Sequence, residues 1–285
     1  MKIFNPRGLP ECVVAAAGGF SDYVPSPGRF GVLDLIGPPL IRKLRIEHWD
    51  DILVEVEDLT AMLLGSGFHL LMEKHSRDAI AEEKVELPYG EFVIAGKVDL
   101  RTKEVIQDFK VTSVWSFVFG DKPEWEAQLN VYRYMLWKKY GEVPDKLQVI
   151  AIFKDWVRSK SESASDYPAA PMMGLNIPVW SLEDAEKYID DRMNTHLTIK
   201  ECTPFERWTR PTTYAVKKRG RKSALRVLNS LEEAQAWLEK NGGDSIETRI
   251  GEDVRCKWYC PVRDFCPYKK EKDNATEEDD VHDTA

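Results

Sequence analysis

Two adjacent segments near the middle of the chain constrain its fold more than any other feature. Residues 91–101 read EFVIAGKVDLR and residues 104–111 read EVIQDFKV, with only Thr102 and Lys103 between them. Apolar and polar residues alternate in both segments, which is typical of β-strands. A connection this short predicts an antiparallel pair, in which the end of the first strand lies beside the second strand.

The segments that follow predict an α/β fold. We expect a helix that begins near Pro123, runs to about Tyr140 and ends at Gly141, because proline suits a first turn and glycine a helix end. Residues 147–153 (LQVIAIF) form a continuous apolar run, typical of a strand buried on both faces. Other expected elements are irregular chain over residues 1–30, short helices over 33–49, helices over 58–83, 181–197 and 230–241, a polar loop over 159–170 and a basic hairpin over 214–228.

Charge is segregated along the chain. The formal net charge of the 285 residues is −8, and residues 271–285 supply −6 of it through seven acids and one base. We expect this acidic tail to be disordered. Residues 211–231, by contrast, contain six bases and no acid. Such a separation is compatible with binding to nucleic acid.

Hydropathy and cysteine content bear on where the chain works. No apolar run approaches the roughly 20 residues that span a bilayer, and the run at residues 13–17 is too short for a signal peptide. We therefore expect a cytoplasmic protein without a membrane partner, whose thiols stay reduced. Five cysteines in that setting indicate metal binding, catalysis or simple burial rather than disulfides.

Polar side chains in the strand pair indicate a cation site. Asp108 and Lys110 are two residues apart, so they point to the same face, and Asp99 lies near the end of the neighbouring strand. Two carboxylates that point together repel unless a cation separates them, and Mg²⁺ prefers such oxygen ligands. A nearby lysine can orient a water or, as the neutral amine, deprotonate it, and its ammonium form can stabilise charge on a phosphate. The alternative is a surface hairpin whose acid and lysine are solvated.

Four ordered motifs resemble the PD-(D/E)XK nuclease superfamily, most closely its RecB-like branch of phage exonucleases and CRISPR-associated iron–sulfur exonucleases. They are Gly65-Ser-Gly-Phe-His69 with Glu73 one turn later, Gly96-Lys-Val-Asp99, Asp108-Phe-Lys110 and Gln128-Leu-Asn-Val-Tyr132. The resemblance covers roughly residues 60–155. One departure is that the second acid is aspartate, where glutamate is the commoner choice.

The resemblance implies a fold and a role for each motif residue. The fold would be a restriction-endonuclease-like α/β core, in which helices flank a central mixed sheet. The metal ligands would be His69, Asp99, Asp108 and the backbone carbonyl of Phe109, with Lys110 as the catalytic lysine and Gln128 and Tyr132 ordering the site and the DNA strand. For His69 the alternative is an ordinary core histidine. The implied parts of the chain are a partly helical lead-in over residues 1–56, the nuclease core over 57–200, a C-terminal module over 201–270 and the tail over 271–285.

A cysteine cluster near the C-terminus predicts a second metal centre. Cys256, Cys260 and Cys266 fall within eleven residues, and Cys202 is the preferred fourth ligand, with Cys12 as its rival. The resemblance favours a structural [4Fe–4S] cluster over zinc, which stays open because thiolates bind both metals. The alternative is that the cysteines are small buried apolar residues.

The expected activity is hydrolysis of DNA by a Mg²⁺- or Mn²⁺-dependent enzyme, starting from ends. The resemblance suggests recombination, replication or repair of the phage type, compatible with a phage-encoded protein in a bacterial host. No Walker A loop is present, so unwinding would come from a partner such as a helicase, with a recombinase or single-strand-binding protein as other partners. The basic residues Lys217, Lys218, Arg219, Arg221 and Lys222 would contact phosphates, unless they form an ordinary solvated face. Two alternatives are a catalytically silent DNA-binding scaffold and a nuclease that acts mainly on RNA.

Overall fold

The computed structural model describes residues 1–19, 24–120 and 122–269. The chain divides into two compact units, Met1–Ile199 and Lys200–Ala285. The expected acidic tail over residues 271–285 lies outside the described residues. Within the described ranges, no helix combines the length and the apolar character needed to cross a bilayer.

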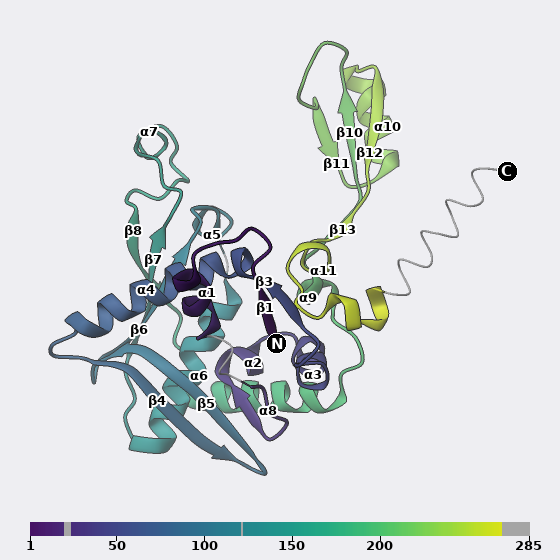
Figure 1. The fold of residues 1–285 in the computed structure, drawn as a ribbon. Coiled ribbons are helices and arrows are strands. Elements are labelled where there is room, and N and C mark those ends of the chain that lie inside the picture. Colours follow the sequence, from purple (N-terminus) through teal and green to yellow (C-terminus); the bar gives the residue numbers. More distant parts are fainter. Residues whose placement is uncertain (20–23, 121, 270–285) are drawn as a thin grey trace. The chain divides into compact units, whose positions relative to one another are not determined.

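A six-stranded mixed sheet forms the centre of the first unit (Figure 1). Strands β2 and β5 are parallel, as are β6 and β7, whereas β4–β5, β5–β6 and β7–β8 are antiparallel. The strands are β2 (Arg29–Gly31), β4 (Ile80–Tyr89), β5 (Phe92–Arg101), β6 (Val105–Thr112), β7 (Lys146–Phe153) and β8 (Met172–Ile177). This arrangement confirms the expected α/β class with a central mixed sheet flanked by helices.

Helices cover both faces of the sheet. Asp108 and Phe109 are consecutive in β6 and therefore point to opposite faces. The Asp108 side chain meets helix α6 (Pro123–Tyr140), and the Phe109 ring meets Phe68 of helix α4 (Thr60–His75), so α4 and α6 lie on opposite sides of β6. The other helices of this unit are α1 (Glu11–Gly18), α2 (Val32–Ile36), α3 (Pro39–Glu47), α5 (Trp115–Val118), α7 (Arg158–Ser161) and α8 (Leu182–Thr198), and a small parallel pair joins β1 (Lys2–Phe4) to β3 (Leu53–Glu55).

The core forms where α6 packs between the sheet and α8. Nine consecutive or nearly consecutive residues of α6, from Ala127 to Leu136, are buried, which fits a helix at the centre of the unit. The helix ends at Gly141 with φ 73°, as its sequence predicts, because glycine adopts this left-handed conformation without a Cβ clash. Because α6 is buried on nearly all sides over this stretch, its position against the sheet is well defined.

Three expectations about local structure are wrong. The helix expected over residues 58–83 ends at His75, and Ile80–Tyr89 forms β4, because a long antiparallel ladder with β5 outweighs the helical spacing of residues 76–83. Residues 1–30 are not irregular, since they contain β1, α1 and part of β2. β7 is fully buried on one face only, and Ile150 and Ile152 on its other face are half-buried.

The second unit contains a small sheet with one helix packed on it. The sheet has the order β11-β10-β12 and is antiparallel throughout. Helix α10 begins after Ser230, whose hydroxyl accepts a hydrogen bond from the Glu233 backbone. The elements are α9 (Pro204–Arg207), β9 (Thr209–Arg210), β10 (Thr213–Lys217), β11 (Arg226–Leu228), α10 (Leu231–Asn241), β12 (Ser245–Arg249), β13 (Glu252–Asp253) and α11 (Val254–Trp258).

Candidate active site

The site lies where β5 changes partners. One edge of β5 pairs with β4 along almost its whole length. Its other edge pairs first with β2, up to Ala95, and then with β6, from Leu100 onward. Between these two ladders, residues 96–99 have no strand partner on that edge among the described residues. The sheet therefore has a gap beside Asp99. Side chains, rather than a neighbouring strand, surround this opening.

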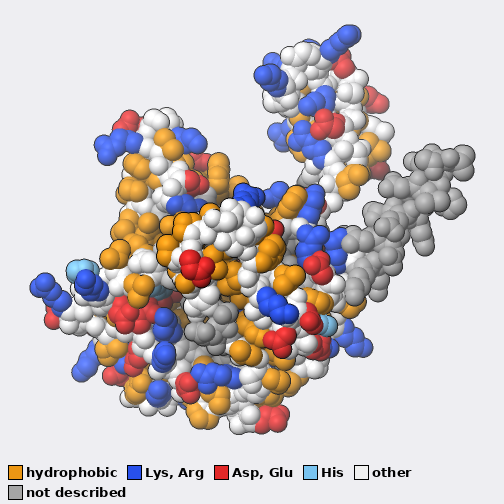
Figure 2. Space-filling model, in the orientation of Figure 1, with side chains coloured by type: hydrophobic (Ala, Val, Ile, Leu, Met, Phe, Trp, Pro, Cys, Tyr) orange, Lys and Arg blue, Asp and Glu red, His pale blue; other side chains and the backbone are white. Residues whose placement is uncertain are grey.

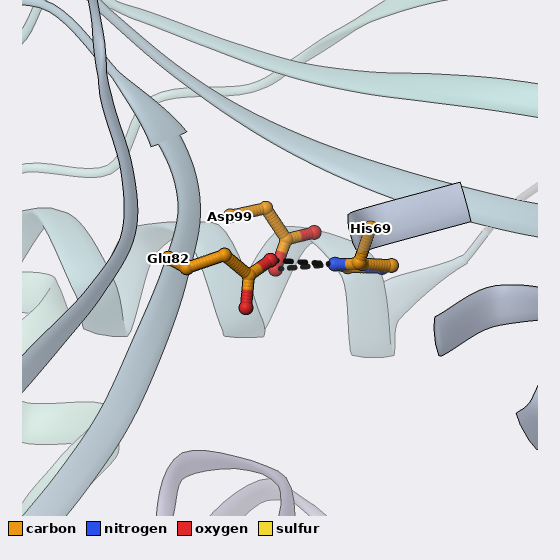
Figure 3. Close-up of side chains that lie close together, drawn as sticks. All are labelled: His69, Glu82 and Asp99. Atoms are coloured by element: carbon orange, nitrogen blue, oxygen red, sulfur yellow. Dashed lines mark hydrogen bonds and ion pairs between the residues drawn. The ribbon is translucent and has the colours of Figure 1, made fainter. Parts of the chain in front are cut away.

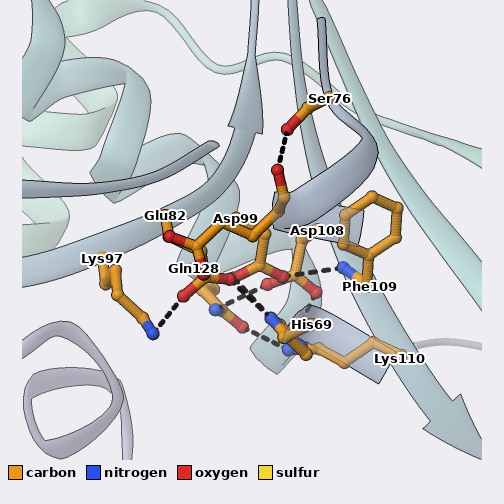
Figure 4. A network of polar contacts seen from close by, with 10 residues as sticks. His69, Ser76, Glu82, Lys97, Asp99, Asp108, Phe109, Lys110 and Gln128 are labelled. Atoms are coloured by element: carbon orange, nitrogen blue, oxygen red, sulfur yellow. Dashed lines mark hydrogen bonds and ion pairs between the residues drawn. The ribbon is translucent and has the colours of Figure 1, made fainter. Parts of the chain in front are cut away.

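Asp99 and Asp108 meet across this opening, as the strand pairing predicts (Figure 4). Continuing the β5–β6 register beyond Leu100 and Gln107 sets the two aspartates opposite each other. Asp99 Oδ2 accepts a hydrogen bond of 2.8 Å from the Phe109 backbone, in place of a ladder bond. Both side chains are buried, with 8% and 2% of the residue exposed. Two carboxylates thus share a confined space with little water.

Gln128 and Lys110 are fixed against Asp108. The Gln128 amide donates to Asp108 Oδ1 over 2.8 Å and accepts from Lys110 Nζ over 2.9 Å. Lys110 Nζ also lies 2.8 Å from Asp108 Oδ2 as an ion pair. That contact falls outside hydrogen-bonding geometry, so Asp108 Oδ2 is a buried carboxylate oxygen without a hydrogen bond. The side chain of Gln128 therefore holds the acid and the lysine in one arrangement.

His69 reaches the same opening from α4, together with an acid that the sequence analysis did not assign (Figure 3). His69 Nδ1 lies 2.9 Å from Glu82 Oε1 and 3.6 Å from Asp99 Oδ1. One ligand atom from each of these three residues lies within 4.8 Å of the other two. An imidazole with two carboxylates at this separation is a donor set that suits a divalent cation.

Glu82 belongs to the site because of β4, which the sequence analysis missed. Glu82 and Asp99 fall between the β4–β5 pairs Ala81–Leu100 and Glu83–Val98, so the ladder brings the two acids side by side. Glu82 also has φ 51°, a conformation that costs a side-chain-bearing residue energy and that occurs at turns, helix ends and active sites. The local sign of this strand is weak, because only Val85 and Leu87 alternate with Lys84 and Glu86, and it competes with the helical spacing of residues 58–83.

The electrostatics of the opening favour a bound cation. Burial, followed by repulsion from Asp108, raises the pKa of Asp99 from 3.8 to about 6. Burial alone would also raise the pKa of Glu82, but hydrogen bonds from Lys97 and His69 hold it below its ordinary value. The raised pKa of Asp99, and an Asp108 oxygen whose one polar contact among the described residues is the ion pair with Lys110, both favour a further positive charge at this opening. The residues present therefore fit a divalent metal ion.

A cavity of about 470 Å³ connects these groups. His69, Asp99, Asp108, Lys110, Gln128 and Tyr132 all line it, so the opening brings together every motif residue whose side chain was predicted to act. Arg45 and Asp34, 3.3 Å apart, line it too, and neither was predicted because they come from separate short helices.

The position of the Tyr132 ring explains why the second motif begins with a glycine, Gly96. A Cβ on residue 96 would lie 2.4 Å from Tyr132 Cε1, so only glycine leaves room for the ring. The neighbour that Gly96 admits is thus a side chain of α6. Burial raises the pKa of Tyr132 far above its usual range, so its hydroxyl stays protonated.

The second unit brings together four of the five cysteines. Burial raises the pKa of Cys202 to about 12, and Glu206, Cys256, Cys260 and Cys266 add to the shift. Burial likewise raises the pKa of Cys260 to about 11, with Cys256 and Cys266 as neighbours. The four thiols therefore lie close enough for their charges to interact. Cys12 is exposed in α1 of the first unit.

The basic residues of the second unit occupy the β10–β11 hairpin, which turns through Gly220 with φ 83°. Lys217 is half-buried and lies 3.5 Å from Glu247, so part of its charge is neutralised. The exposed bases of the turn are Lys218, Arg219, Arg221 and Lys222. Figure 2 shows basic side chains at the surface of this part of the unit.

Comparison with known proteins gives structural likenesses only. No protein-family model and no curated protein sequence matches the chain. The crystal structure of SSO0001 aligns with 69% of this chain and 89% of its own, at 15% identity and a TM-score of 0.46. An alkaline exonuclease from Laribacter hongkongensis aligns with 48% of this chain and 69% of its own, at 9% identity and a TM-score of 0.33. A candidate exonuclease from Eubacterium rectale aligns with 50% of this chain and 51% of its own, at 12% identity and a TM-score of 0.32. Likenesses at these scores assign no activity, so the function proposed below rests on the geometry of the site.

Proposed function

We propose that this protein is a metal-dependent nuclease that hydrolyses phosphodiester bonds in DNA. One observation carries the proposal. A buried pair of carboxylates, Asp99 and Asp108, lies in an open cavity beside Lys110, and one oxygen of Asp108 has no hydrogen bond. Carboxylates arranged in this way hold a cation, and a cation beside an ammonium group suits a reaction that builds negative charge on a phosphate.

The metal ligands would be Asp99, Asp108 and His69, with the Phe109 carbonyl as a further donor and Glu82 as an addition to the set. When bound, Mg²⁺ or Mn²⁺ would stabilise the negative charge that develops on the phosphate. The carboxylates and the imidazole also fit Mn²⁺, which accepts nitrogen ligands more readily than Mg²⁺ does.

Lys110 would act on the reacting atoms. Its ammonium group lies in the cavity and can donate a hydrogen bond to the attacking water and to a phosphate oxygen. Gln128 is a positioning residue, because its amide bonds to both Asp108 and Lys110 and keeps their spacing. Tyr132 closes the cavity wall above Gly96 and keeps a protonated hydroxyl near the carboxylates.

Digestion of end-labelled linear DNA and of covalently closed circular DNA distinguishes an exonuclease from an endonuclease. With Mn²⁺ or Mg²⁺ the protein should shorten linear DNA and leave closed circles intact, and a chelator should stop cleavage. Cut circles would indicate an endonuclease, and preferential cleavage of RNA would change the substrate. Binding of DNA without any cleavage at any metal concentration would contradict the proposal. The sequence resemblance extends the proposal to recombination, replication or repair, where a helicase, recombinase or single-strand-binding protein would act on the same DNA.

For the second unit we propose a Cys₄-ligated [4Fe–4S] cluster that stabilises the fold. The proposal is supported by the closeness of the four cysteines, each of which adds to the shift in the pKa of Cys202 or carries that shift. Thiols must lose their protons to bind metal, so a bound cation would have to displace protons that burial now holds on Cys202 and Cys260. Protein purified without oxygen should contain about four iron atoms. Cys202→Ala should lose the metal and lower the thermal stability of the second unit.

Cys12→Ala is the matched control and should keep full metal content. Loss of the metal in Cys12→Ala with retention in Cys202→Ala would contradict the choice of ligand. If the protein contains zinc instead of iron, the cysteine site is right and the proposed metal is wrong. If protein purified without oxygen contains no metal, the proposed metal centre is wrong.

We also propose that the β10–β11 turn contacts DNA phosphates. Replacing Lys218, Arg219, Arg221 and Lys222 together with alanine should weaken DNA binding and flatten its salt dependence. A plot of log affinity against log salt has a negative slope, and each lost phosphate contact should reduce the magnitude of this slope by about one. Lys240→Ala, an exposed lysine at the end of α10, should leave the slope unchanged. An equal slope in the quadruple variant and the wild type would show that this turn faces away from DNA.

A further inference from the structure

Helix α5 and Phe119, the residue that caps its end, present two exposed aromatic rings shortly after the strand that carries Asp108 and Lys110. Trp115 is 50% exposed and Phe119 is 75% exposed. The two rings are stacked, with centroids 5.5 Å apart and planes 23° from parallel. Large aromatic side chains normally gain stability by burial, so a stacked pair held in solvent indicates a binding surface.

The segment that carries these rings is firmly anchored. Asp155, just after β7, accepts a hydrogen bond of 2.6 Å from the Ser113 hydroxyl and one of 2.8 Å from the Val114 backbone. Val114 is buried, and the Phe117 ring packs edge-on against Phe153 in the core, 6.0 Å between centroids. Trp115 and Phe119 are spaced i, i+4 and share the outer face of the turn. The exposed rings are therefore held in place by contacts made on the inner face.

The rings also lie close to the reacting groups. Lys110 and Trp115 are five positions apart in the chain, which limits the distance between their Cα atoms to about 18 Å. Lys110 and Thr112 point to the same face of β6, and the Thr112 hydroxyl lies 2.7 Å from that of Ser116 in α5. The surface of α5 thus continues from the end of β6 that lies beyond Lys110.

A positive charge accompanies the rings. The Lys154 backbone donates a hydrogen bond of 2.9 Å to the Thr112 carbonyl, which ties Lys154 to the start of the α5 segment. The Lys154 side chain is exposed. Flat aromatic faces on a segment joined to an exposed lysine match the chemistry of a single nucleic-acid strand, whose bases stack on rings and whose phosphates pair with lysine. An apolar protein partner would not require the rings to lie nearly parallel.

We propose that Trp115 and Phe119 form a stacking platform for unpaired bases of the DNA strand that enters the active site. The preferred substrate is then a single-stranded or frayed end rather than an intact duplex. This inference rests on the proposed nuclease function, because it assigns the substrate strand of the same site. It predicts that binding at α5 depends on the bases, whereas binding at the β10–β11 turn depends on phosphates.

Binding of two single strands by the full-length Lys110→Ala protein tests this inference. One strand is oligothymidylate, and the other has the same length and backbone but only abasic sugars. Adding Trp115→Ala or Phe119→Ala should raise the Kd for oligothymidylate about tenfold, the loss of one stacked base, and leave the Kd for the abasic strand unchanged. Trp115→Phe should keep most of the affinity, whereas Trp115→Leu, which keeps apolar bulk without a flat ring, should lose it.

Tyr140→Ala removes another exposed aromatic ring, at the far end of α6, and should change neither Kd. Equal losses on both strands, no loss on oligothymidylate, or full affinity in Trp115→Leu would each overturn the stacking platform. These outcomes leave the nuclease proposal intact. If Lys110→Ala bound neither strand while the wild type also failed to cleave, the proposed function would fail first, and the platform with it.

Discussion

Replacing Lys110 with alanine should lower the rate of DNA cleavage by about 10³-fold or more. The ammonium group is the one cation fixed against Asp108 within the described residues, and removing a group that stabilises transition-state charge typically costs about 10²–10³-fold. Loss of a proton-transfer or water-orienting role would add to that. Folding and metal affinity should change little, because Lys110 is not among the proposed ligands. Single-turnover cleavage of end-labelled DNA, together with thermal unfolding in Mn²⁺, measures both effects.

Lys103→Ala is the matched control for this variant. Lys103 lies in the turn of the same hairpin, exposed to solvent and away from the cavity lining. It should cleave at the wild-type rate. A Lys110→Ala protein that cleaves as fast as Lys103→Ala would contradict the assignment of the reacting lysine, even if metal dependence remained.

Asp99→Asn should stabilise the metal-free protein at pH 8 and abolish its response to metal. The ionised Asp99 carboxylate is disfavoured by burial and by Asp108, whereas a neutral amide of the same shape can still accept the bond from Phe109. A pKa raised from 3.8 to about 6 corresponds to about 3 kcal/mol at a pH above both values. For a unit of this size, that gain should raise the melting temperature by about 5–10 °C.

The pH dependence of this effect follows from the direction of the shift. In the folded protein Asp99 keeps its proton up to about pH 6, whereas in the unfolded chain it loses the proton near pH 3.8. Proton binding by Asp99 therefore favours the folded protein at low pH, and this contribution to the free energy of unfolding is lost as pH rises from about 4 to about 6. The advantage of Asp99→Asn should be full at pH 8 and absent near pH 4.

Metal should reverse the order of the melting temperatures of the wild type and Asp99→Asn. Millimolar Mn²⁺ should raise the melting temperature of the wild type and leave that of Asp99→Asn unchanged, because binding to the folded state stabilises it by mass action. Asp78→Asn, which changes an exposed aspartate before β4, should behave as the wild type throughout. An Asp99→Asn protein that is less stable without metal, or that still responds to Mn²⁺, would contradict the cation site.

The strand pair and the helix after it were predictable because their signals are local. Alternation over residues 91–101 and 104–111 fixes the faces of two strands, and the short turn fixes their register. Pro123 and Gly141 mark the ends of α6 for steric reasons that need no tertiary context. Asp99, Asp108 and Lys110 could therefore be placed together from local patterns, whereas Gln128 was assigned to the site through the resemblance of its motif.

Glu82 could not be assigned in the same way, because its role depends on pairing at a distance. A helical interpretation of residues 58–83 sets Glu82 on a solvated helix face. Only the ladder between β4 and β5 turns it toward Asp99. Local spacing was ambiguous there, and the energy of the ladder decides between helix and strand.

Arg45 shows a second limit of local patterns. Its guanidinium lines the cavity from α3, far along the chain from the strand pair, and nothing in the spacing of residues 39–47 links it to Asp99. The same holds for the exposed rings of α5, since burial of Phe117 and exposure of Phe119 depend on the core beneath them.

The most direct test of a metal-dependent nuclease at this opening is a Mn²⁺ titration in which occupancy and cleavage are followed on the same wild-type sample. Occupancy is measured as the rise in melting temperature, and cleavage as the rate of shortening of end-labelled DNA. Both should increase together with one half-saturating concentration, and both should vanish in Asp99→Asn and on addition of a chelator. Cleavage that persists in the chelator, or that survives Asp99→Asn at the wild-type rate, would contradict the site.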